Sequence, residues 1–376
     1  MFENLSLLAL QHYWWFVIAV LGALFVFMNF VQGGQTLLYT LGKSDKERNV
    51  IINSLGRKWE LTFTALVMFG GALFAAFPLF YAVSFGGAYY LWMAILFSFI
   101  IQAVSYEYRK KPDNIFGERS YEWLLFINGS AGVFLIGVAV ATLFTGGNFI
   151  VNEMNLSHWT MRSYGLEAVL NPFNVAFGLM LFFLARIQGS MYFLNNIAEE
   201  SIAVRARKSI KSSALYFLPL FIGVVIAILM MNGYGYDPAT KEVQIVAYKY
   251  LNNLIAMPTL AAMLLLGTLL VLFSLYSTLY KESKKGIWLS GLGTVLVVMS
   301  LFLLLGWNNT VYYPSLSDLQ SSLSIENSSS SHYTLTAMSY VSLFVPFVLG
   351  YIILVWRAMD RDPITIDEVE ADSHHY

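Results

Sequence analysis

The amino-acid sequence predicts an all-α integral membrane protein with nine transmembrane helices arranged in helical bundles. Its 376 residues are 57% hydrophobic and only 12% charged, whereas a soluble domain carries about 25% charged residues. The mean hydropathy is +0.62, and the apolar residues gather in runs of the roughly 20 residues that a membrane-crossing helix needs. We expect a single membrane domain over residues 1–376, with an acidic tail over 358–376.

Charge and composition exclude several classes of function. The formal net charge is −1 and the chain contains no cysteine. No basic surface argues for nucleic-acid binding, and without thiols the chain forms no disulfide and holds no thiolate-ligated iron–sulfur cluster or haem. The first residues show neither a basic segment nor a small-residue cleavage site, so we expect the chain to start at Met1 without a cleaved leader.

Spans one to four are apolar runs separated by short charged or glycine-containing connections. We expect them near 12–39, 61–82, 87–106 and 122–145. The tryptophans in this half fall near the ends of the runs, where amphipathic indole rings prefer to lie. They are Trp14, Trp15, Trp59 and Trp123.

Spans five to nine are also apolar runs, but the connections on one side of the membrane are longer. We expect them near 172–196, 212–232, 251–280, 286–307 and 335–357. Tryptophans again stand near their ends, at Trp288, Trp307 and Trp356. The long connections are 146–171, 233–250 and 308–334, and the serine-rich stretch 321–335 is interpreted as a polar loop leading into span nine.

The basic residues predict the orientation, because cytoplasmic loops carry an excess of lysine and arginine. One set of alternating connections, together with the tail, holds 18 of the 22 basic residues. These are Lys43, Lys46, Arg48, Arg57, Lys58, Arg109, Lys110, Lys111, Arg119, Arg205, Arg207, Lys208, Lys211, Lys281, Lys284, Lys285, Arg357 and Arg361. We therefore predict that the N-terminus lies outside and the acidic tail in the cytoplasm.

The first span contains an uncharged polar stripe in the stretch FMNFVQGGQTLLY, residues 27–39. Asn29, Gln32, Gly33, Thr36 and Thr40 follow a helical spacing that puts them on one face. Small and amide residues of this kind normally face other helices, where they allow close approach and interhelical hydrogen bonds. The pattern favours helix packing, and a polar lining for water or a hydrophilic ligand is the alternative.

Charged residues in or beside membrane spans are few, which makes each a candidate for function. Glu60 follows Trp59 at the start of span two. It can be a first-turn acid favoured by the helix dipole, or a carboxylate that exchanges protons. Glu107 and Glu122 border spans three and four, and for them the helix-end interpretation is favoured.

Arg186 is the one basic residue inside a span. It lies ten residues from the end of span five, which is roughly 15 Å along a helix. That is far for a side chain that snorkels to the interface. We therefore favour a buried partner for Arg186, either a carboxylate or another subunit.

The histidines argue against a redox centre held by this chain alone. His12, His158 and His332 fall at a span edge or in connections, and His374 and His375 fall in the tail. A haem between helices needs axial ligands at membrane depth, usually histidine or methionine. The 15 methionines are better explained as gap-filling apolar side chains. We expect no metal site and no bound cofactor in this chain.

Several motifs resemble subunit II of cytochrome bd-type quinol oxidases. The run GGALFAAFP at 70–78 is close to that family's GGALFAAWP, within a similar stretch over 44–90. The other matching segments are Leu170-Asn171-Pro172-Phe173, Gln188-Gly189, residues 321–338 and Val345-Pro346. They occur in consistent order from residue 40 to residue 357, and the family also has nine spans.

The resemblance implies a heterodimer in the bacterial cytoplasmic (inner) membrane. The partner would be subunit I, which in this family carries haem b and haem d, oxidises quinol and reduces oxygen to water with protons from the cytoplasm. This chain would be a scaffold and part of a proton route. A structural quinone and small single-span subunits are further possible components, and Trp59 is a candidate for contact with a quinone or an interface.

The sequence departs from the family pattern in span one. Where the family has T-D-G-F-D, this chain reads Met28-Asn29-Phe30-Val31-Gln32, so amides replace both acids. Near the end of span three, Gln102-Ala103 stands where an arginine–proline pair is common. An amide can hold a water molecule but cannot titrate near neutral pH. The family's tryptophan–aspartate pair is present as Trp59-Glu60, so Glu60 is the remaining candidate for proton transfer.

Two other functions remain as alternatives. A secondary transporter of a small solute would use the polar stripe and Arg186, although broken helices and internal repeats typical of transporters are not evident in the sequence. A purely structural or assembly protein would support the abundance of its partner without affecting the partner's specific activity.

Overall fold

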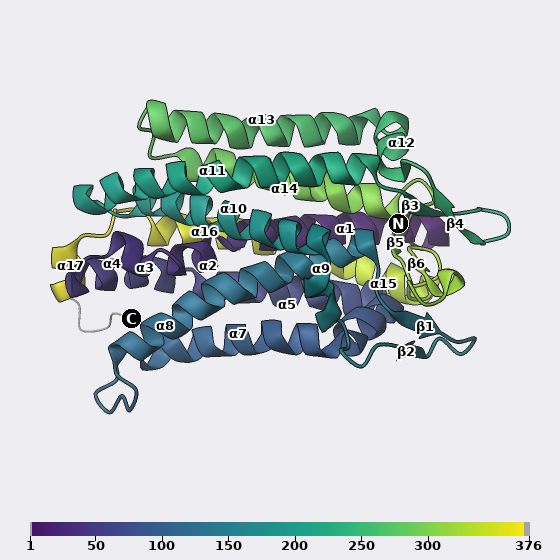
Figure 1. Cartoon of the computed structure of the whole chain (residues 1–376), viewed down its shortest axis with the longest axis horizontal. Coiled ribbons are helices and arrows are strands. Elements are labelled where there is room, and N and C mark those ends of the chain that lie inside the picture. Colours follow the sequence, from purple (N-terminus) through teal and green to yellow (C-terminus); the bar gives the residue numbers. More distant parts are fainter. Residues whose placement is uncertain (1, 372–376) are drawn as a thin grey trace.

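The computed structural model describes residues 2–371, which form a stack of long helices that run along one axis (Figure 1). Within this part of the chain, nine helical segments are long and apolar enough to cross a membrane. The prediction of nine transmembrane helices is therefore confirmed. The segments are Leu7–Gln35, Asp45–Ala76, Tyr89–Tyr108, Glu118–Thr145, Pro172–Asn196, Glu200–Met230, Pro258–Tyr280, Gly286–Gly306 and His332–Met359.

These segments are divided into shorter helices where glycine, asparagine or proline interrupts the backbone. The first half of the chain contains α1 (Leu7–Met28), α2 (Phe30–Gln35), α3 (Leu38–Leu41), α4 (Asp45–Gly56), α5 (Trp59–Ala76), α6 (Pro78–Tyr81), α7 (Tyr89–Tyr108), α8 (Glu118–Ile127) and α9 (Val133–Thr145). π-Helical turns at Ala82–Gly87 and Asn128–Gly132 precede α7 and α9. The second half contains α10 (Pro172–Asn196), α11 (Glu200–Met230), α12 (Lys249–Ala256), α13 (Pro258–Tyr280), α14 (Gly286–Gly306), α15 (His332–Ser342), α16 (Val345–Met359) and α17 (Ile366–Ala371).

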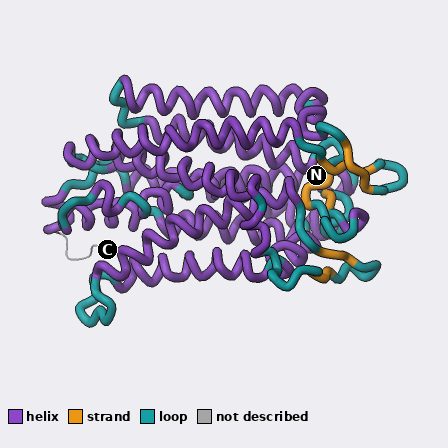
Figure 2. Tube along the Cα trace, viewed as in Figure 1, coloured by secondary structure: helices purple, strands orange, loops and turns teal. Residues whose placement is uncertain are grey.

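The two ends of the stack differ in structure and in charge. Short antiparallel hairpins gather at one end, together with the N-terminal residues (Figure 2). They are β1 (Phe149–Val151) with β2 (Ser157–Trp159), β3 (Gly233–Tyr236) with β4 (Val243–Val246), and β5 (Val311–Tyr313) with β6 (Leu323–Ser324). The connections 40–58, 107–117, 197–211 and 281–285 lie at the opposite end, here called the basic end, which the sequence predicts to face the cytoplasm.

Three helix boundaries differ from the sequence-based expectation. The expected single span 12–39 is broken at Asn29, whose side-chain amide donates to the Phe25 carbonyl at 3.0 Å. Span two ends at Ala76 rather than near 82, because Pro78 has no N–H to continue the ladder and starts α6 instead. Helix α11 starts at Glu200 rather than near 212, so it extends well beyond the apolar run. The last five residues of the predicted acidic tail lie outside the described residues.

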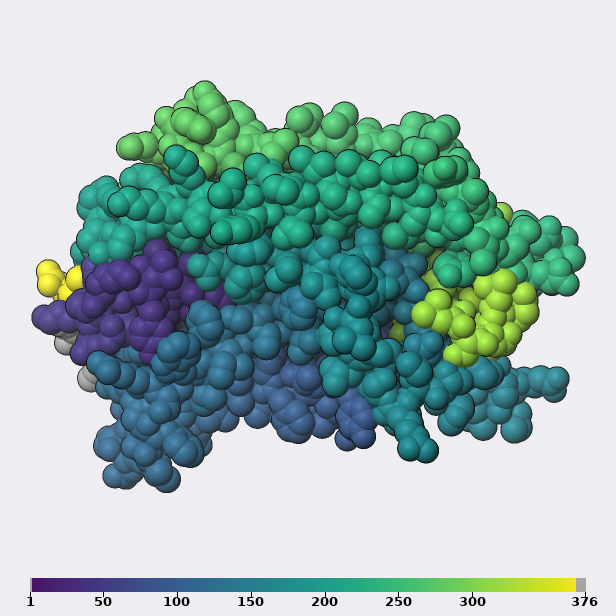
Figure 3. Space-filling model, viewed as in Figure 1, coloured from purple at the N-terminus to yellow at the C-terminus, as the bar shows by residue number. Residues whose placement is uncertain are grey.

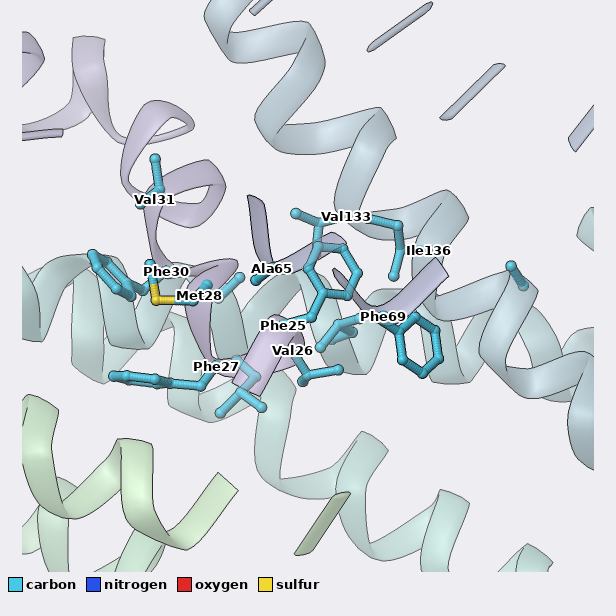
Figure 4. Packing of buried hydrophobic residues seen from close by; sticks show 14 of the residues in the cluster. Phe25, Val26, Phe27, Met28, Phe30, Val31, Ala65, Phe69, Val133 and Ile136 are labelled. Atoms are coloured by element: carbon cyan, nitrogen blue, oxygen red, sulfur yellow. The ribbon is translucent and has the colours of Figure 1, made fainter. Parts of the chain in front are cut away.

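The core is built around α1 and α10, the most buried helices of the stack. Helix α1 packs between α5 and α14. Its side chains Phe25 and Val26 meet Phe69 of α5, with Val133 and Ile136 of α9 nearby (Figure 4). Because most of the α1 and α10 surface is covered by protein, the polar residues they carry are enclosed at membrane depth.

Glycines let α2 cross α10 at very short range. A Cβ atom added at Gly33 would lie 1.9 Å from the carbonyl oxygen of Ala185, and one added at Gly189 would lie 2.5 Å from the Gly34 amide nitrogen. Both neighbours are backbone atoms that cannot move aside. This close approach confirms that the glycines of span one serve helix packing.

Replacing Gly33 by alanine should therefore separate α2 from α10. We expect the Gly33→Ala variant to lose about 1–3 kcal/mol of stability, the usual penalty for overpacking. Thermal unfolding of the purified complex measures this loss. Gly223→Ala on α11 is the matched control, because nothing lies within 4 Å of the added Cβ there. Equal melting temperatures for the two variants would contradict the close-packing argument.

Candidate functional site

The polar residues of span one meet two other helices in a buried cluster of amides. This amide cluster consists of Asn29, Gln32, Gln35, Gln102 and Asn128, each no more than 1% exposed. The Gln32 side-chain amide donates to the Gln102 Oε1 atom of α7 at 2.9 Å. The Gln35 amide donates to the Tyr106 hydroxyl, also on α7, at 3.2 Å. The cluster therefore joins α2 to α7, beside the π-helical turn that carries Asn128.

The predicted single-faced stripe is divided between two neighbours. Gln32 points to α7, whereas Gly33 packs on α10 and Thr36 contacts Arg186 of α10. Helical hydrogen bonds continue through this stretch, because the Gly33 amide donates to the Asn29 carbonyl at 2.9 Å and the Thr36 amide to the Gln32 carbonyl at 3.3 Å. The stripe is therefore wide enough to meet α7 on one side and α10 on the other. Helix packing describes the Gly33 side, and polar lining around Gln32 stays a prediction.

Several amide atoms of the cluster have no hydrogen-bond partner among residues 2–371. They include acceptors, on Asn29, Gln32 and Gln35, and a donor, the Nε2 atom of Gln102. Both polar atoms of the Asn128 side chain are also unpaired. A buried polar group without a partner costs about 1–3 kcal/mol, and ordered water commonly satisfies such groups. Because unpaired donors and acceptors occur together, water fits the cluster better than a cation.

Aromatic side chains connect the amide cluster to the basic end. The Tyr106 ring stacks on the Trp59 ring with centroids 5.7 Å apart and planes at 9°. The Trp59 Nε1 atom is buried and has no partner among the described residues. The polar atoms of Trp59, Tyr106 and the amide cluster therefore form a series from the first residue of α5 to the interior of the bundle.

Glu60 lies outside this cluster, on the exposed side of α5. Its side chain is exposed, and no hydrogen bond or ion pair within residues 2–371 includes it. It shares a stripe with Phe63, Val67 and Phe74, which are 38%, 56% and 60% exposed. The carboxylate is therefore available to a neighbouring molecule rather than to the interior of this chain.

A buried ion cluster at the basic end was missed by the sequence interpretation. Glu122 is 1% exposed and accepts from Arg109 at 2.7 Å and from the Tyr39 hydroxyl at 3.0 Å. It also forms an ion pair with Arg48, whose Nε atom lies 3.2 Å away. Burial, the Glu122 charge and this hydrogen bond raise the pKa of Tyr39 to about 12. We interpreted Glu122 as a helix-end acid, because its two arginine partners lie 13 and 74 positions away and no local pattern connects them.

Arg186 has a backbone partner rather than an acidic one. Its Nη1 atom donates to the Thr36 carbonyl at 3.2 Å and to the Thr36 hydroxyl at 2.8 Å. No ion pair within residues 2–371 includes it. Thr36 follows the last residue of α2, so the guanidinium stands where the negative end of a helix dipole favours a cation.

Comparisons with known proteins agree along nearly the whole chain. The family model described as "Cytochrome bd terminal oxidase subunit II" matches residues 10–359. The "Cytochrome bd-I ubiquinol oxidase subunit 2" of Escherichia coli K12 is 28% identical over 379 residues, covering 97% of this chain and 98% of that protein. The "Cytochrome bd ubiquinol oxidase subunit 2" of Bacillus subtilis 168 is 27% identical, covering 95% and 99%. The bd oxidase structure from Geobacillus thermodenitrificans superposes with a TM-score of 0.56 at 11% identity, over 94% of this chain and 99% of that one, which shows a shared fold.

Proposed function

Because the chain belongs to the cytochrome bd terminal oxidase subunit II family, we propose that it is the non-haem subunit of a quinol oxidase and supplies part of the proton route. The match over residues 10–359, which includes all but the first residues of the nine spans, carries this conclusion. The chain is a multi-pass protein of the bacterial inner membrane and a subunit of a quinol:oxygen oxidoreductase. The transporter alternative has no support, since the relatives described above are oxidase subunits.

The haems implied by the family do not fit the histidines of this chain. His12 and His332 bind the backbone carbonyls of Leu8 and Leu5 at the end opposite the basic end, and His158 lies in strand β2. Within residues 2–371, no group of three or more potential metal ligands occurs. We therefore assign haem b and haem d to subunit I.

The surface of α5 is our candidate for contact with subunit I. Other exposed helices, such as α13, present mainly leucine and phenylalanine to their surroundings, which suits lipid. Helix α5 instead combines Glu60 with Gly71, where nothing lies within 4 Å of an added Cβ. An unpaired carboxylate at a helix end and a bare glycine on one stripe are typical of helix–helix contacts in membranes. Subunit I would cover both the Glu60 carboxylate and the surface at Gly71.

Proton transfer in this proposal uses Glu60 and water. Glu60 is a titratable group on the proposed contact surface, at the end predicted to face the cytoplasm. The unpaired atoms of the amide cluster can hold ordered water, and the amides themselves cannot carry a proton. In this scheme Glu60 takes up protons and passes them towards subunit I, while water in the amide cluster keeps the inner half of the bundle polar.

An apolar pocket between α10, α11, α13 and α14 suits a hydrocarbon chain better than the head group of a structural quinone. Two threonine hydroxyls are the hydroxyl groups in its lining. Thr268 donates to the Leu264 carbonyl, and Thr294 accepts from the Gln188 side-chain amide. A quinone head group needs hydrogen-bond donors for its carbonyl oxygens. We place no quinone in this pocket.

Purification of the tagged chain tests the proposed function. The chain should bring with it a second membrane subunit that absorbs as b-type and d-type haem, and the complex should consume oxygen when quinol is added. A chain that purifies stably alone, without a haem-bearing companion and without quinol-dependent oxygen uptake, would contradict the proposal.

The Glu60→Gln variant tests the proton route separately. We expect quinol-dependent oxygen uptake to fall about tenfold, equivalent to about 1.36 kcal/mol in barrier height, with the haem spectrum unchanged. The reason is that glutamine keeps the shape but cannot release a proton. Glu282→Gln, in the exposed turn between α13 and α14, is the control and should keep full activity. Wild-type turnover of Glu60→Gln across the pH range would remove Glu60 from the route.

A further inference from the structure

Part of the Arg186 guanidinium makes no hydrogen bond within the described residues and lies at the surface of α10. Only Nη1 bonds within the chain, to Thr36. The Nε and Nη2 atoms have no partner among the described residues, and they are not among the enclosed unpaired atoms, so they reach the surface. The guanidinium carbon lies 5.6 Å from the centre of the Phe182 ring. A cation with free donors therefore stands beside an aromatic side chain on a membrane helix.

The depth of Arg186 follows from the hairpin formed by α10 and α11. The rings of Phe183 and Tyr216 stack across the two antiparallel helices with centroids 5.0 Å apart. Three residues further, Arg186 is level with Ser213 on α11. The charged part of α11 ends at Lys211 and its apolar run follows. Arg186 thus lies at the boundary between charge and hydrocarbon, where lipid head groups lie.

This depth corrects the premise that favoured a buried partner for Arg186. From the sequence, span five is expected to reach the membrane surface near Asn196. The charged segment of α11 is helical from Glu200 and packs along α10. We infer that Arg186, level with the end of this charged segment, lies nearer to the membrane surface than its distance from Asn196 suggests.

Two acids of the basic end have basic partners other than Arg186. Glu47 of α4 binds Arg205, and Glu200 lies 3.7 Å from Arg207. Lys208 is exposed and has no partner among the described residues. The local balance of unpaired charge, from Arg186 and Lys208, is positive.

An exposed stripe of α11, here called the α11 stripe, leads from this charge into the apolar region. Lys208, Ser212 and Tyr216 recur every fourth residue on α11, so they share the stripe that meets α10 at Phe183. Tyr216 is 54% exposed and Leu179 of α10 is 37% exposed. Helix α3 packs against α11. On the face shown in Figure 3, the surface of α11 meets the purple segment that includes α3 and α4.

We propose that Arg186 and Lys208 bind the phosphate of an anionic phospholipid from the leaflet at the basic end, with one acyl chain along the α11 stripe. Arginine presents several N–H donors in a geometry that matches phosphate oxygens. Anionic lipids of the cytoplasmic leaflet are attracted to basic residues near the membrane surface. Charge complementarity and the adjoining exposed apolar side chains together select a lipid, whereas free phosphate would use only the charge.

Lipid retention by the whole purified complex tests this site. The complex is reconstituted in nanodiscs of phosphatidylcholine with phosphatidylglycerol, released in detergent and examined by native mass spectrometry. We expect Arg186→Leu to retain one phosphatidylglycerol molecule fewer than wild type, and Arg186→Lys to retain it. Inorganic phosphate added in excess should not displace the lipid.

A second variant tests the site while leaving the contact between Arg186 and Thr36 intact. Ser212→Glu adds a negative charge between Lys208 and Tyr216 on an exposed position of α11 and should also lose the lipid. Its matched control is Ser283→Glu in the turn between α13 and α14, which should keep it. Wild-type retention in both Ser212→Glu and Arg186→Leu would overturn the proposal. So would the loss of a small protein subunit, rather than a lipid, from either variant.

Discussion

Replacing Glu122 by glutamine is expected to destabilise the protein strongly. The change removes the negative charge that faces Arg109 at 2.7 Å and Arg48 at 3.2 Å, and these arginines are only 1% and 8% exposed. The two arginines would keep the exposed acids Asp45 and Glu118 as ionic partners, but removing the buried partner of an ion pair costs about 3–5 kcal/mol. Thermal or denaturant-induced unfolding of the purified complex measures the loss.

Glu118→Gln provides the matched control for this prediction. Glu118 contacts the same Arg109 at 3.3 Å, but its side chain is 47% exposed. Solvent-exposed pairs contribute about 0–1 kcal/mol, so this variant should unfold close to wild type. If Glu118→Gln and Glu122→Gln lose equal stability, burial is not what makes the Glu122 cluster strong. A further variant, Tyr39→Phe, removes one hydrogen bond to the Glu122 carboxylate and should cost about 1.5–3 kcal/mol, the usual value for a bond to a charged group.

The sequence was sufficient for the membrane fold because hydropathy and charge are local properties. Each span can be recognised from its own residues, and the basic residues place alternate connections at one end. Boundaries were less predictable where a helix continues past the apolar run. Helix α11 starts at Glu200 because its charged first turns pack beside α4, where Glu47 binds Arg205. That contact joins residues 158 positions apart, and no local pattern contains it.

The candidate site was predictable in composition but not in arrangement. The sequence singled out Asn29, Gln32 and Thr36 as one face, but it could not foresee that two helices share this face, with Gln32 bonded to α7 and Thr36 to α10. The roles of Glu60 and of the amide cluster stay predictions. Long-range pairs were also inaccessible, because recognising them requires the fold itself.

The second large loss of stability is expected from a change in the C-terminal segment that follows α16. Asp360 accepts from Lys58 at 2.8 Å and from the Asn196 side-chain amide at 3.0 Å. The Lys58 side chain is completely buried and that of Asp360 is 8% exposed. Beyond Asp360, the Ile364 amide donates to the Asn196 carbonyl at 2.8 Å. The segment after α16 is thus attached to the start of α5 and to the turn between α10 and α11.

The Asp360→Asn variant should lose about 3–5 kcal/mol, because asparagine leaves the Lys58 ammonium buried without a counter-ion. Unfolding of the complex, followed together with the rate of proteolysis after residue 359, measures both the stability and the attachment of the tail. Glu368→Gln is the control. Its partner Arg57 lies 3.0 Å away, but the two side chains are 28% and 47% exposed, so its effect should stay within about 1 kcal/mol.

A double variant separates the charge from the shape of this contact. Replacing a buried ion pair by apolar side chains of similar volume is often neutral or stabilising, so Lys58→Met with Asp360→Leu should recover most of the stability that Asp360→Asn loses. Recovery of stability with a protected tail would show that the single variant fails because of the unpaired ammonium. A double variant as unstable as Asp360→Asn would instead show that losing the hydrogen bond from Asn196 to residue 360, which asparagine can keep and leucine cannot, costs as much as the unpaired ammonium.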